Sequence, residues 1–198
     1  MPAEMPATPR DYAATARRWL FAIATVALLA AGASWAWRQP FAARLRVGWE
    51  LSRMPPANAL PVPVAGVSAR QIAATFDAPR GRDRRHAGVD IFATRGTAVR
   101  SATRGIVVSV RDAGLGGRQV WVLGPARERY YYAHLDDWTT GLRVGDVIES
   151  GDPLGMVGNT GNASGTPPHL HFGIYGRGGA RDPLPLLRAG ADSGQDTR

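Results

Sequence analysis

Short apolar runs separated by turn residues fill the chain from about residue 64 onward. The runs are rich in β-branched and aromatic residues, and Gly-Asp, Gly-Asn and Gly-Gly pairs lie between them. Many short strands at this spacing predict an all-β domain, an antiparallel β-sandwich or barrel-like fold. The predicted strands are Val89–Phe92, Thr97–Arg100, Gly105–Arg111, Gln119–Leu123, Tyr130–Ala133, Val147–Glu149, Leu154–Val157 and His169–Tyr175.

A longer apolar run lies near the N-terminus, where the 19 residues from Trp19 to Trp37 carry no charge. This length suits a bilayer crossing, and tryptophan at both ends suits its interfaces. The alternative is a cleavable signal peptide with Ala31-Gly32-Ala33 as the cleavage site, although the usual apolar core of a signal is shorter, about 7–15 residues. We therefore expect a transmembrane helix that anchors an exported domain at the inner membrane. A cleaved signal would instead release a secreted or periplasmic protein.

These patterns divide the chain into successive parts. The segment after the apolar run is weakly amphipathic and predicts a juxtamembrane helix, which Pro55-Pro56 ends. Pro61-Val62-Pro63-Val64 then marks an extended linker. The expected parts are a disordered tail (1–18), the anchor or signal (19–37), the juxtamembrane helix and Pro-rich linker (38–63), the β-domain (64–188) and a disordered tail (189–198).

Composition narrows the chemistry available to the β-domain. The chain has 198 residues, 44% of them hydrophobic, which suits one domain with a real core plus an extension. It contains no cysteine, so disulfides and thiolate zinc sites are excluded, and histidine and carboxylates are the available metal ligands. The net charge is +8, but the arginines are scattered without a nucleic-acid-reading motif. We expect no nucleic-acid partner, whereas an anionic polymer fits this charge.

Two of the four histidines flank one residue at the start of the last predicted strand. Successive side chains of a strand point to opposite faces, so His169 and His171 share a face. Two imidazoles a few ångströms apart suit a metal site or a proton-transfer site. The plainer interpretation is a pair of surface histidines.

A possible third and fourth member of this group lie just before the first predicted strand. His86 and Asp90 form a His-x-x-x-Asp spacing, and both side chains face one way if the segment bends at Gly88. With His171 from a neighbouring strand they make two histidines and a carboxylate, a set that holds Zn²⁺ and leaves a fourth position for water. Water on such an ion has its pKa lowered to about 7.

The remaining histidine, His134, closes a run of aromatic residues in Tyr-Tyr-Tyr-Ala-His-Leu. One interpretation is a buried, hydrogen-bonded histidine beside the tyrosines. The other pairs it with His169 outside the metal shell, where two imidazoles could take a proton from water and stabilise an oxyanion. His169 could alternatively be a fourth metal ligand, which would make the site closed and structural.

The ordered motifs His-x-x-x-Asp, Tyr-Ala-His-Leu, Gly-Asn-Thr-Gly-Asn and His-Leu-His-Phe resemble those of the LytM/lysostaphin-type zinc metallopeptidases. Members of that family are endopeptidases that cut the peptide part of bacterial peptidoglycan, and the resemblance covers roughly Val64 to Tyr175. It implies that Zn²⁺ binds to His86, Asp90 and His171, with His134 and His169 as the catalytic pair. It implies a peptidoglycan peptide as substrate and leaves any cell-division or wall-synthesis partner open.

The chain departs from the family pattern at two places near the expected substrate groove. Asp77 stands where the family commonly has glycine, and Thr166-Pro167-Pro168 lengthens the loop before His-x-His. Both bear on substrate preference more than on chemistry. Two other functions stay open: a non-enzymatic wall-binding regulator that activates another hydrolase, and a cupin-type metalloenzyme, against which the Tyr-Ala-His element argues.

Overall fold

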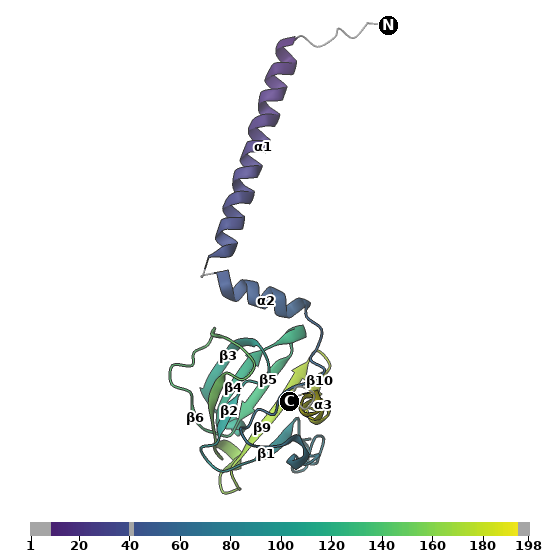
Figure 1. The fold of residues 1–198 in the computed structure, drawn as a ribbon, viewed down its shortest axis with the longest axis vertical. Coiled ribbons are helices and arrows are strands. Elements are labelled where there is room, and N and C mark those ends of the chain that lie inside the picture. The colour runs from purple at the N-terminus through teal and green to yellow at the C-terminus, as the bar shows by residue number, and fades with distance from the viewer. Residues whose placement is uncertain (1–8, 40–41, 194–198) are drawn as a thin grey trace. The chain divides into compact units, whose positions relative to one another are not determined.

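The structure is a computed structural model that describes residues 9–39 and 42–193. The chain forms two compact units, residues 1–46 and residues 47–198. The first consists mainly of one long helix, and the second contains all of the strands (Figure 1).

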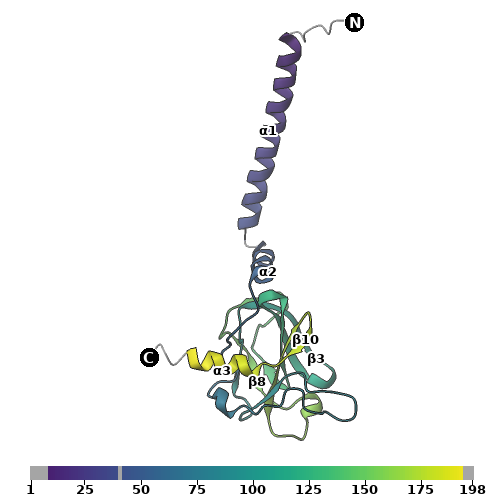
Figure 2. The same cartoon turned by 90° about the vertical axis from the view of Figure 1, so that its right-hand side faces the viewer.

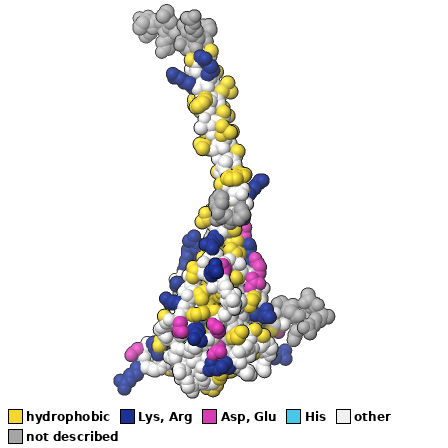
Figure 3. All heavy atoms as spheres, turned by 90° about the vertical axis from the view of Figure 1, so that its left-hand side faces the viewer, with side chains coloured by type: hydrophobic (Ala, Val, Ile, Leu, Met, Phe, Trp, Pro, Cys, Tyr) yellow, Lys and Arg dark blue, Asp and Glu magenta, His cyan; other side chains and the backbone are white. Residues whose placement is uncertain are grey.

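Helix α1 (Pro9–Arg38) contains the predicted charge-free run. Its stretch Tyr12–Arg38 is long and apolar enough to cross a membrane, a test that an N-terminal signal sequence would also pass. Large apolar side chains are exposed along it, among them Phe21 and Leu28, and Figure 3 shows hydrophobic side chains over much of its surface. The helix begins inside the segment 1–18 for which we predicted disorder, and residues 1–8 lie outside the described part of the chain.

Helix α2 (Ala43–Arg53) is the predicted amphipathic helix, with Val47 and Leu51 buried and Trp49 exposed. The Pro-rich segment after it is extended, as expected, and it also packs on the domain. Leu60 is buried and donates its main-chain N–H to the carbonyl of Leu186 at 3.0 Å. Val64 is buried and forms an isolated bridge with Val99.

The strands form two sheets in which all neighbouring strands are antiparallel. The large sheet has the order β1-β9-β5-β4-β3-β7, with β10 also paired to β9, and the small sheet has the order β2-β8-β6. Among the described residues, this pairing does not close the large sheet into a barrel. The strands are β1 (Val89–Phe92), β2 (Ala98–Arg100), β3 (Gly105–Asp112), β4 (Arg118–Leu123), β5 (Arg129–Ala133), β6 (Leu135–Trp138), β7 (Val147–Ile148), β8 (Pro153–Val157), β9 (His169–Gly176) and β10 (Gly179–Arg181).

Every predicted strand is present within one or two residues of its predicted bounds, whereas β6 and β10 were not predicted. β6 carries Asp136-Asp137 and β10 begins with glycine, and both residue types are depleted in strands. Helix α3 (Leu184–Ser193) follows β10 (Figure 2). Its Leu184 and Leu187 are buried in the core. The expected domain end at 188 falls inside α3, and residues 194–198 lie outside the described part of the chain.

Alternation along β5 and β9 separates the core from the opposite face of the large sheet. Tyr130, Tyr132 and Phe172 are fully buried in a core that also takes residues from the small sheet. Tyr131, between the two tyrosines of β5, and His171, next to Phe172 on β9, lie on the opposite face and are only partly buried. His171 and Tyr131 therefore lie on one face of the large sheet, and the other face packs in the core.

Candidate metal centre and active site

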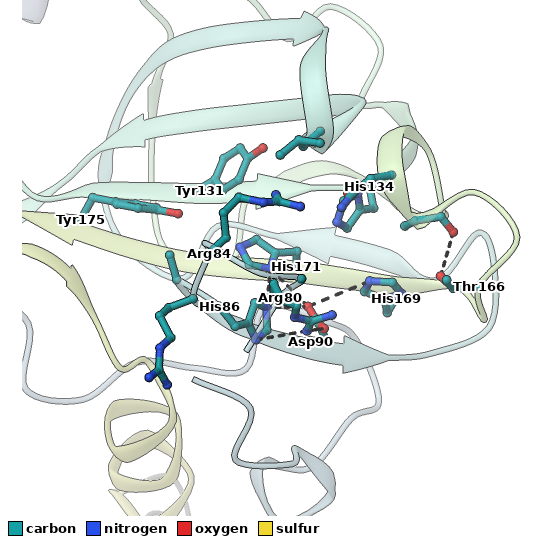
Figure 4. Close-up of a pocket in the computed structure, with 17 residues that line it drawn as sticks. Arg80, Arg84, His86, Asp90, Tyr131, His134, Thr166, His169, His171 and Tyr175 are labelled. Atoms are coloured by element: carbon teal, nitrogen blue, oxygen red, sulfur yellow. Dashed lines mark hydrogen bonds and ion pairs between the residues drawn. The ribbon is translucent and has the colours of Figure 1, made fainter. Parts of the chain in front are cut away.

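A pair of strands brings the first candidate ligands together. β1 and β9 are antiparallel neighbours in which Asp90 lies opposite His171, and His86 immediately precedes β1. His86 Nε2 lies 2.9 Å from His171 Nδ1. Asp90 Oδ1 lies 3.1 Å from each of these two nitrogens. Three potential ligand atoms thus form a nearly equilateral triangle (Figure 4).

This triangle fits a tetrahedral metal ion. Ligand bonds of about 2.0–2.1 Å place the ligand atoms of a tetrahedral zinc site about 3.3 Å apart. The observed edges are slightly shorter, so a small relaxation of three side chains would accommodate the ion. The side chains are shielded as well, with 5% of His86, 8% of Asp90 and 13% of His171 exposed.

The orientation of His86 is fixed by the main chain. Its Nδ1 lies 2.8 Å from the carbonyl oxygen of Thr75. A carbonyl only accepts, so Nδ1 carries the proton and donates, which leaves the Nε2 lone pair directed at Asp90 and His171. Arg80 Nη2, 3.2 Å from the same Nδ1, is also a donor and therefore does not hydrogen-bond to it in this tautomer.

The two oxygens of Asp90 have different partners. Oδ1 belongs to the triangle, whereas Oδ2 pairs with the guanidinium of Arg80. Burial alone would raise the pKa of the Asp90 carboxyl, but the neighbouring rings of His171 and His86 together outweigh burial and lower this pKa far below its usual range. Asp90 is therefore a carboxylate at every pH at which the protein would work, as a metal ligand must be.

Gly88 permits the close approach of the segment before β1 to strand β9. A β-carbon at this position would lie 2.3 Å from the carbonyl oxygen of Phe172 and 3.0 Å from the ring of His171. The glycine therefore lets the chain carry both His86 and Asp90 to the same ring. The chain bends at Gly88, which is the predicted condition for His86 and Asp90 to face one way.

His134 and His169 lie beside the triangle with their rings 5.1 Å apart. His134 Nδ1 lies 2.9 Å from the carbonyl oxygen of Thr160, and His169 Nδ1 lies 2.8 Å from that of Pro167. Each Nδ1 therefore donates to the main chain, and in the neutral ring each Nε2 is an acceptor. His169 Nε2 lies 4.0 Å from Asp90 Oδ1, farther than the two histidine nitrogens of the triangle.

His134 has an unusual backbone and an unusual pKa. Its φ is 64°, in the left-handed region that a histidine seldom adopts, and it follows β5 directly. Burial, and then the neighbouring His171, lower the pKa of His134 from 6.5 to about 4, against a smaller opposing effect of its hydrogen bond to Thr160. Burial likewise lowers the pKa of His171. The neutral form of His134 therefore prevails near pH 7.

All five predicted site residues line one cavity of about 420 Å³. None of the four histidines is an exposed surface residue, so the plainer interpretation of His169 and His171 is wrong. Tyr131, Arg80 and Arg84 also line this cavity, although no sequence motif pointed to them. Tyr131 could have been found, because it alternates with the core tyrosines of β5 and so shares the face of the histidines. No spacing rule would have found the arginines, which lie on a loop.

The two departures from the family pattern both lie near this cavity. Asp77 has φ 61°, so it occupies the left-handed conformation that glycine adopts most readily, and its main-chain N–H donates to the carbonyl of His86 at 2.8 Å. Thr166 lines the cavity, and Pro167 supplies the acceptor for His169. The loop before β9 therefore helps to position His169.

Fold and site together define a class of protein: an antiparallel β-domain with a His-Asp-His group able to bind a metal ion and two further imidazoles at its edge. Residues 84–183, half of the chain, match Peptidase family M23, and the chain belongs to this family. The match includes each of the five site residues.

Among curated relatives, the chain is 36% identical over 118 residues to the L-Ala--D-Glu endopeptidase of Bacillus subtilis. That alignment covers 55% of this chain and 36% of the relative. The chain thus spans about a third of the length of this relative, and 22% of the length of lysostaphin from Staphylococcus simulans.

Two solved structures illustrate the likeness of the fold. The catalytic domain of lysostaphin from Staphylococcus simulans matches with a TM-score of 0.53 and 30% identity, over 60% of this chain and 92% of that domain. A zinc-containing peptidase from Vibrio cholerae matches with a TM-score of 0.56 and 28% identity, over 65% of this chain and 40% of the other. These matches support a metallopeptidase fold for this chain.

Proposed function

We propose that the protein is an exported zinc metalloendopeptidase that hydrolyses peptide bonds in the stem peptides or cross-links of peptidoglycan. One observation carries the proposal: a His-Asp-His triangle and two further imidazoles, oriented by main-chain carbonyls, face a single cavity. The relatives include an L-Ala--D-Glu endopeptidase and a glycyl-glycine endopeptidase, and the resemblance to the LytM/lysostaphin-type enzymes supplies peptidoglycan as the substrate class.

In this proposal His86 Nε2, Asp90 Oδ1 and His171 Nδ1 hold Zn²⁺, because they are the three ligand atoms that converge. The bound ion would supply a Lewis acid for the scissile carbonyl and would lower the pKa of water to about 7. The contact between Thr75 and His86 and the pairing of Arg80 with Asp90 keep these ligands in place.

His134 and His169 handle the proton and the developing oxyanion. A neutral imidazole whose Nε2 is an acceptor can take a proton from the attacking water, and His134 is kept neutral by burial. Once protonated, the same nitrogen donates to an oxyanion or to the departing amine. Because the two rings are adjacent, the pair can divide these tasks across the scissile bond.

The location of the enzyme follows from α1. We propose that α1 anchors the chain in the inner membrane as a single span, with the catalytic domain on the outer side. The alternative is a cleaved signal that releases the domain to the periplasm or the medium. In both cases the domain reaches the compartment that contains peptidoglycan.

The proposal is tested on the full-length chain loaded with Zn²⁺ and incubated with purified peptidoglycan. Mass spectrometry of the released muropeptides detects activity and identifies the bond that is cut. His171→Ala should lose both bound zinc and activity. His134→Ala should keep about one zinc per chain by elemental analysis and should lose activity about 10²–10⁴-fold, the usual contribution of general acid–base catalysis.

Circular dichroism spectra of the variants check that each one is folded. Release of muropeptides by His134→Ala at the wild-type rate would contradict the proposed mechanism. A wild-type chain that binds the wall but releases no muropeptide would favour the non-enzymatic regulator instead.

A further inference from the structure

Positive charge gathers at the rim of the cavity. Three of its lining residues, Arg80, Arg84 and Arg85, are arginines, whereas Asp90 is the single carboxylate among those lining residues. Asp90 also belongs to the metal triangle. The cavity of the described domain is therefore cationic even before a divalent ion contributes its own charge.

Two of these arginines are engaged within the domain. Arg80 pairs with Asp90 Oδ2. Arg85 donates to the main-chain carbonyl of Asp77 at 2.9 Å and lies 3.5 Å from its carboxylate. Each of these two guanidinium groups therefore lies within ion-pair distance of a carboxylate, Asp90 for Arg80 and Asp77 for Arg85.

Arg84 is placed differently. No carboxylate of the described residues lies within ion-pair distance of its guanidinium, and its side chain is exposed. Figure 4 shows this side chain extending over the cavity in the direction of His134. Its main chain is held firmly, since the carbonyl of Arg84 accepts from the N–H of Arg80 at 2.9 Å and Arg85 bridges to Pro79.

We propose that Arg84 binds a free carboxylate of the peptide substrate and so determines which peptides the site accepts. This inference rests on the proposed function. A planar guanidinium donates two parallel hydrogen bonds to a carboxylate, a geometry that adds specificity as well as strength. An arginine that forms no ion pair with the described residues, beside a site for a divalent cation, favours an anionic ligand.

A carboxylate-binding Arg84 would discriminate between peptide substrates that the β-domain fold alone does not distinguish. Peptidoglycan peptides with a free carboxylate near the scissile bond should be preferred. Uncharged glycine bridges, and peptides whose carboxylates are amidated, should be poor substrates because they leave Arg84 without an acceptor.

Calorimetric binding to the zinc-loaded, full-length His134→Ala variant tests this without turnover. The probes are a peptidoglycan stem peptide with free carboxylates and the same peptide with each carboxylate converted in turn to a primary amide. One amide should weaken binding about 10–100-fold, the range expected for a charge-assisted hydrogen-bond pair. Adding Arg84→Gln should abolish that difference, and Arg84→Lys should restore part of it, because lysine keeps the charge but not the fork.

Arg82→Gln is the matched control. It removes the same charge from the same loop, but Arg82 does not line the cavity, so the preference for the free carboxylate should persist. Equal binding of all probes to the His134→Ala parent, or an unchanged preference after Arg84→Gln, would overturn the inference. Muropeptide release by the wild-type chain tests the proposed function separately. Cleavage without a carboxylate preference would contradict only the role of Arg84. Carboxylate-dependent binding without cleavage would contradict only the proposed peptidase activity.

Discussion

Three histidines around the cavity are held in the same way. His86, His134 and His169 each donate Nδ1–H to a main-chain carbonyl within 2.9 Å, and this fixes both the tautomer and the plane of each ring. Main-chain acceptors are insensitive to most substitutions, so the orientation of these rings depends on backbone path more than on neighbouring side chains. His171 is the exception, because its Nδ1 faces Asp90 and His86.

The buried, neutral state of His134 predicts a pH-dependent stability. Its pKa falls from 6.5 in the unfolded chain to about 4 in the folded domain. Between these two values the unfolded chain binds a proton that the folded chain does not, so stability falls as the pH drops from 6.5 toward 4. Above pH 6.5 His134 is mainly neutral in both the folded and the unfolded chain, so it adds no pH dependence to the free energy of unfolding.

Replacing His134 with Gln should remove this component. In urea unfolding at pH 4.5–6.5, the free energy of unfolding of His134→Gln should vary less steeply with pH than that of the wild type. The difference in slope should be about 1 kcal/mol per pH unit, because one proton is involved. Identical slopes for the two proteins would contradict a depressed pKa at this residue.

At the scale of elements, the site is a product of strand pairing. β1, β9 and β5 are consecutive neighbours, in which Asp90 lies opposite His171 and His171 lies opposite Ala133, next to His134. The sequence predicts each of these strands, and the alternation of β9 correctly places His169 and His171 on one face. Pairing order is not contained in any local pattern. The grouping of His86 with His171, 85 residues apart in sequence, was therefore a hypothesis from the residue types, which the family resemblance then supported.

Other features of the site could not be predicted for related reasons. The left-handed conformations of Asp77 and His134 are uncommon for residues other than glycine, and no sequence pattern marks the positions where they occur. The cavity-lining loop that carries Arg80 and Arg84 has no periodicity to interpret. β6 was missed because paired aspartates disfavour a strand, yet it pairs with β8 in the small sheet.

The approach of the β1 segment to β9 predicts a specific effect of Gly88→Ala. The added carbon would collide with the carbonyl of Phe172 and the ring of His171, so the two segments would have to separate. We expect a loss of stability of about 1–3 kcal/mol, as for other overpacked sites, together with weaker zinc binding. Urea unfolding and competition with a zinc chelator measure the two effects.

Gly178→Ala is the control for this substitution. A β-carbon at Gly178 would meet nothing within 4 Å, so stability and zinc affinity should stay close to those of the wild type. If Gly88→Ala bound zinc as tightly as Gly178→Ala, the proposed role of the close approach in placing the ligands would be wrong.

At the scale of the whole molecule, the chain joins an apolar helix to a metallopeptidase domain of the M23 family. The sequence predicts both parts, since a long charge-free run and a set of short alternating strands are strong signals. It does not decide whether α1 stays attached, because a membrane span and a signal share the same composition.

Retention of α1 is tested by expressing the full chain with a C-terminal tag and separating membranes from soluble fractions. We expect the tagged protein in the membrane fraction, resistant to extraction by alkaline carbonate, with an intact mass that includes residues 19–37. A domain of arginine-rich surface held only by charge would be released by high salt. A soluble product that begins after Ala33 would show instead that the segment is a cleaved signal.

The two ends of the β-domain are fastened to each other. Leu60, at its entry, donates to the carbonyl of Leu186, at its exit, and Arg181 donates to the carbonyl of Ala57 at 2.7 Å. A module whose chain enters and leaves at one place can be inserted into longer polypeptides without disturbing its sheets. The chain aligns to only about a third of the Bacillus subtilis relative, as expected for a domain that occurs within longer proteins. The sequence around such a domain can then vary and change the location of the enzyme and the substrates that it reaches.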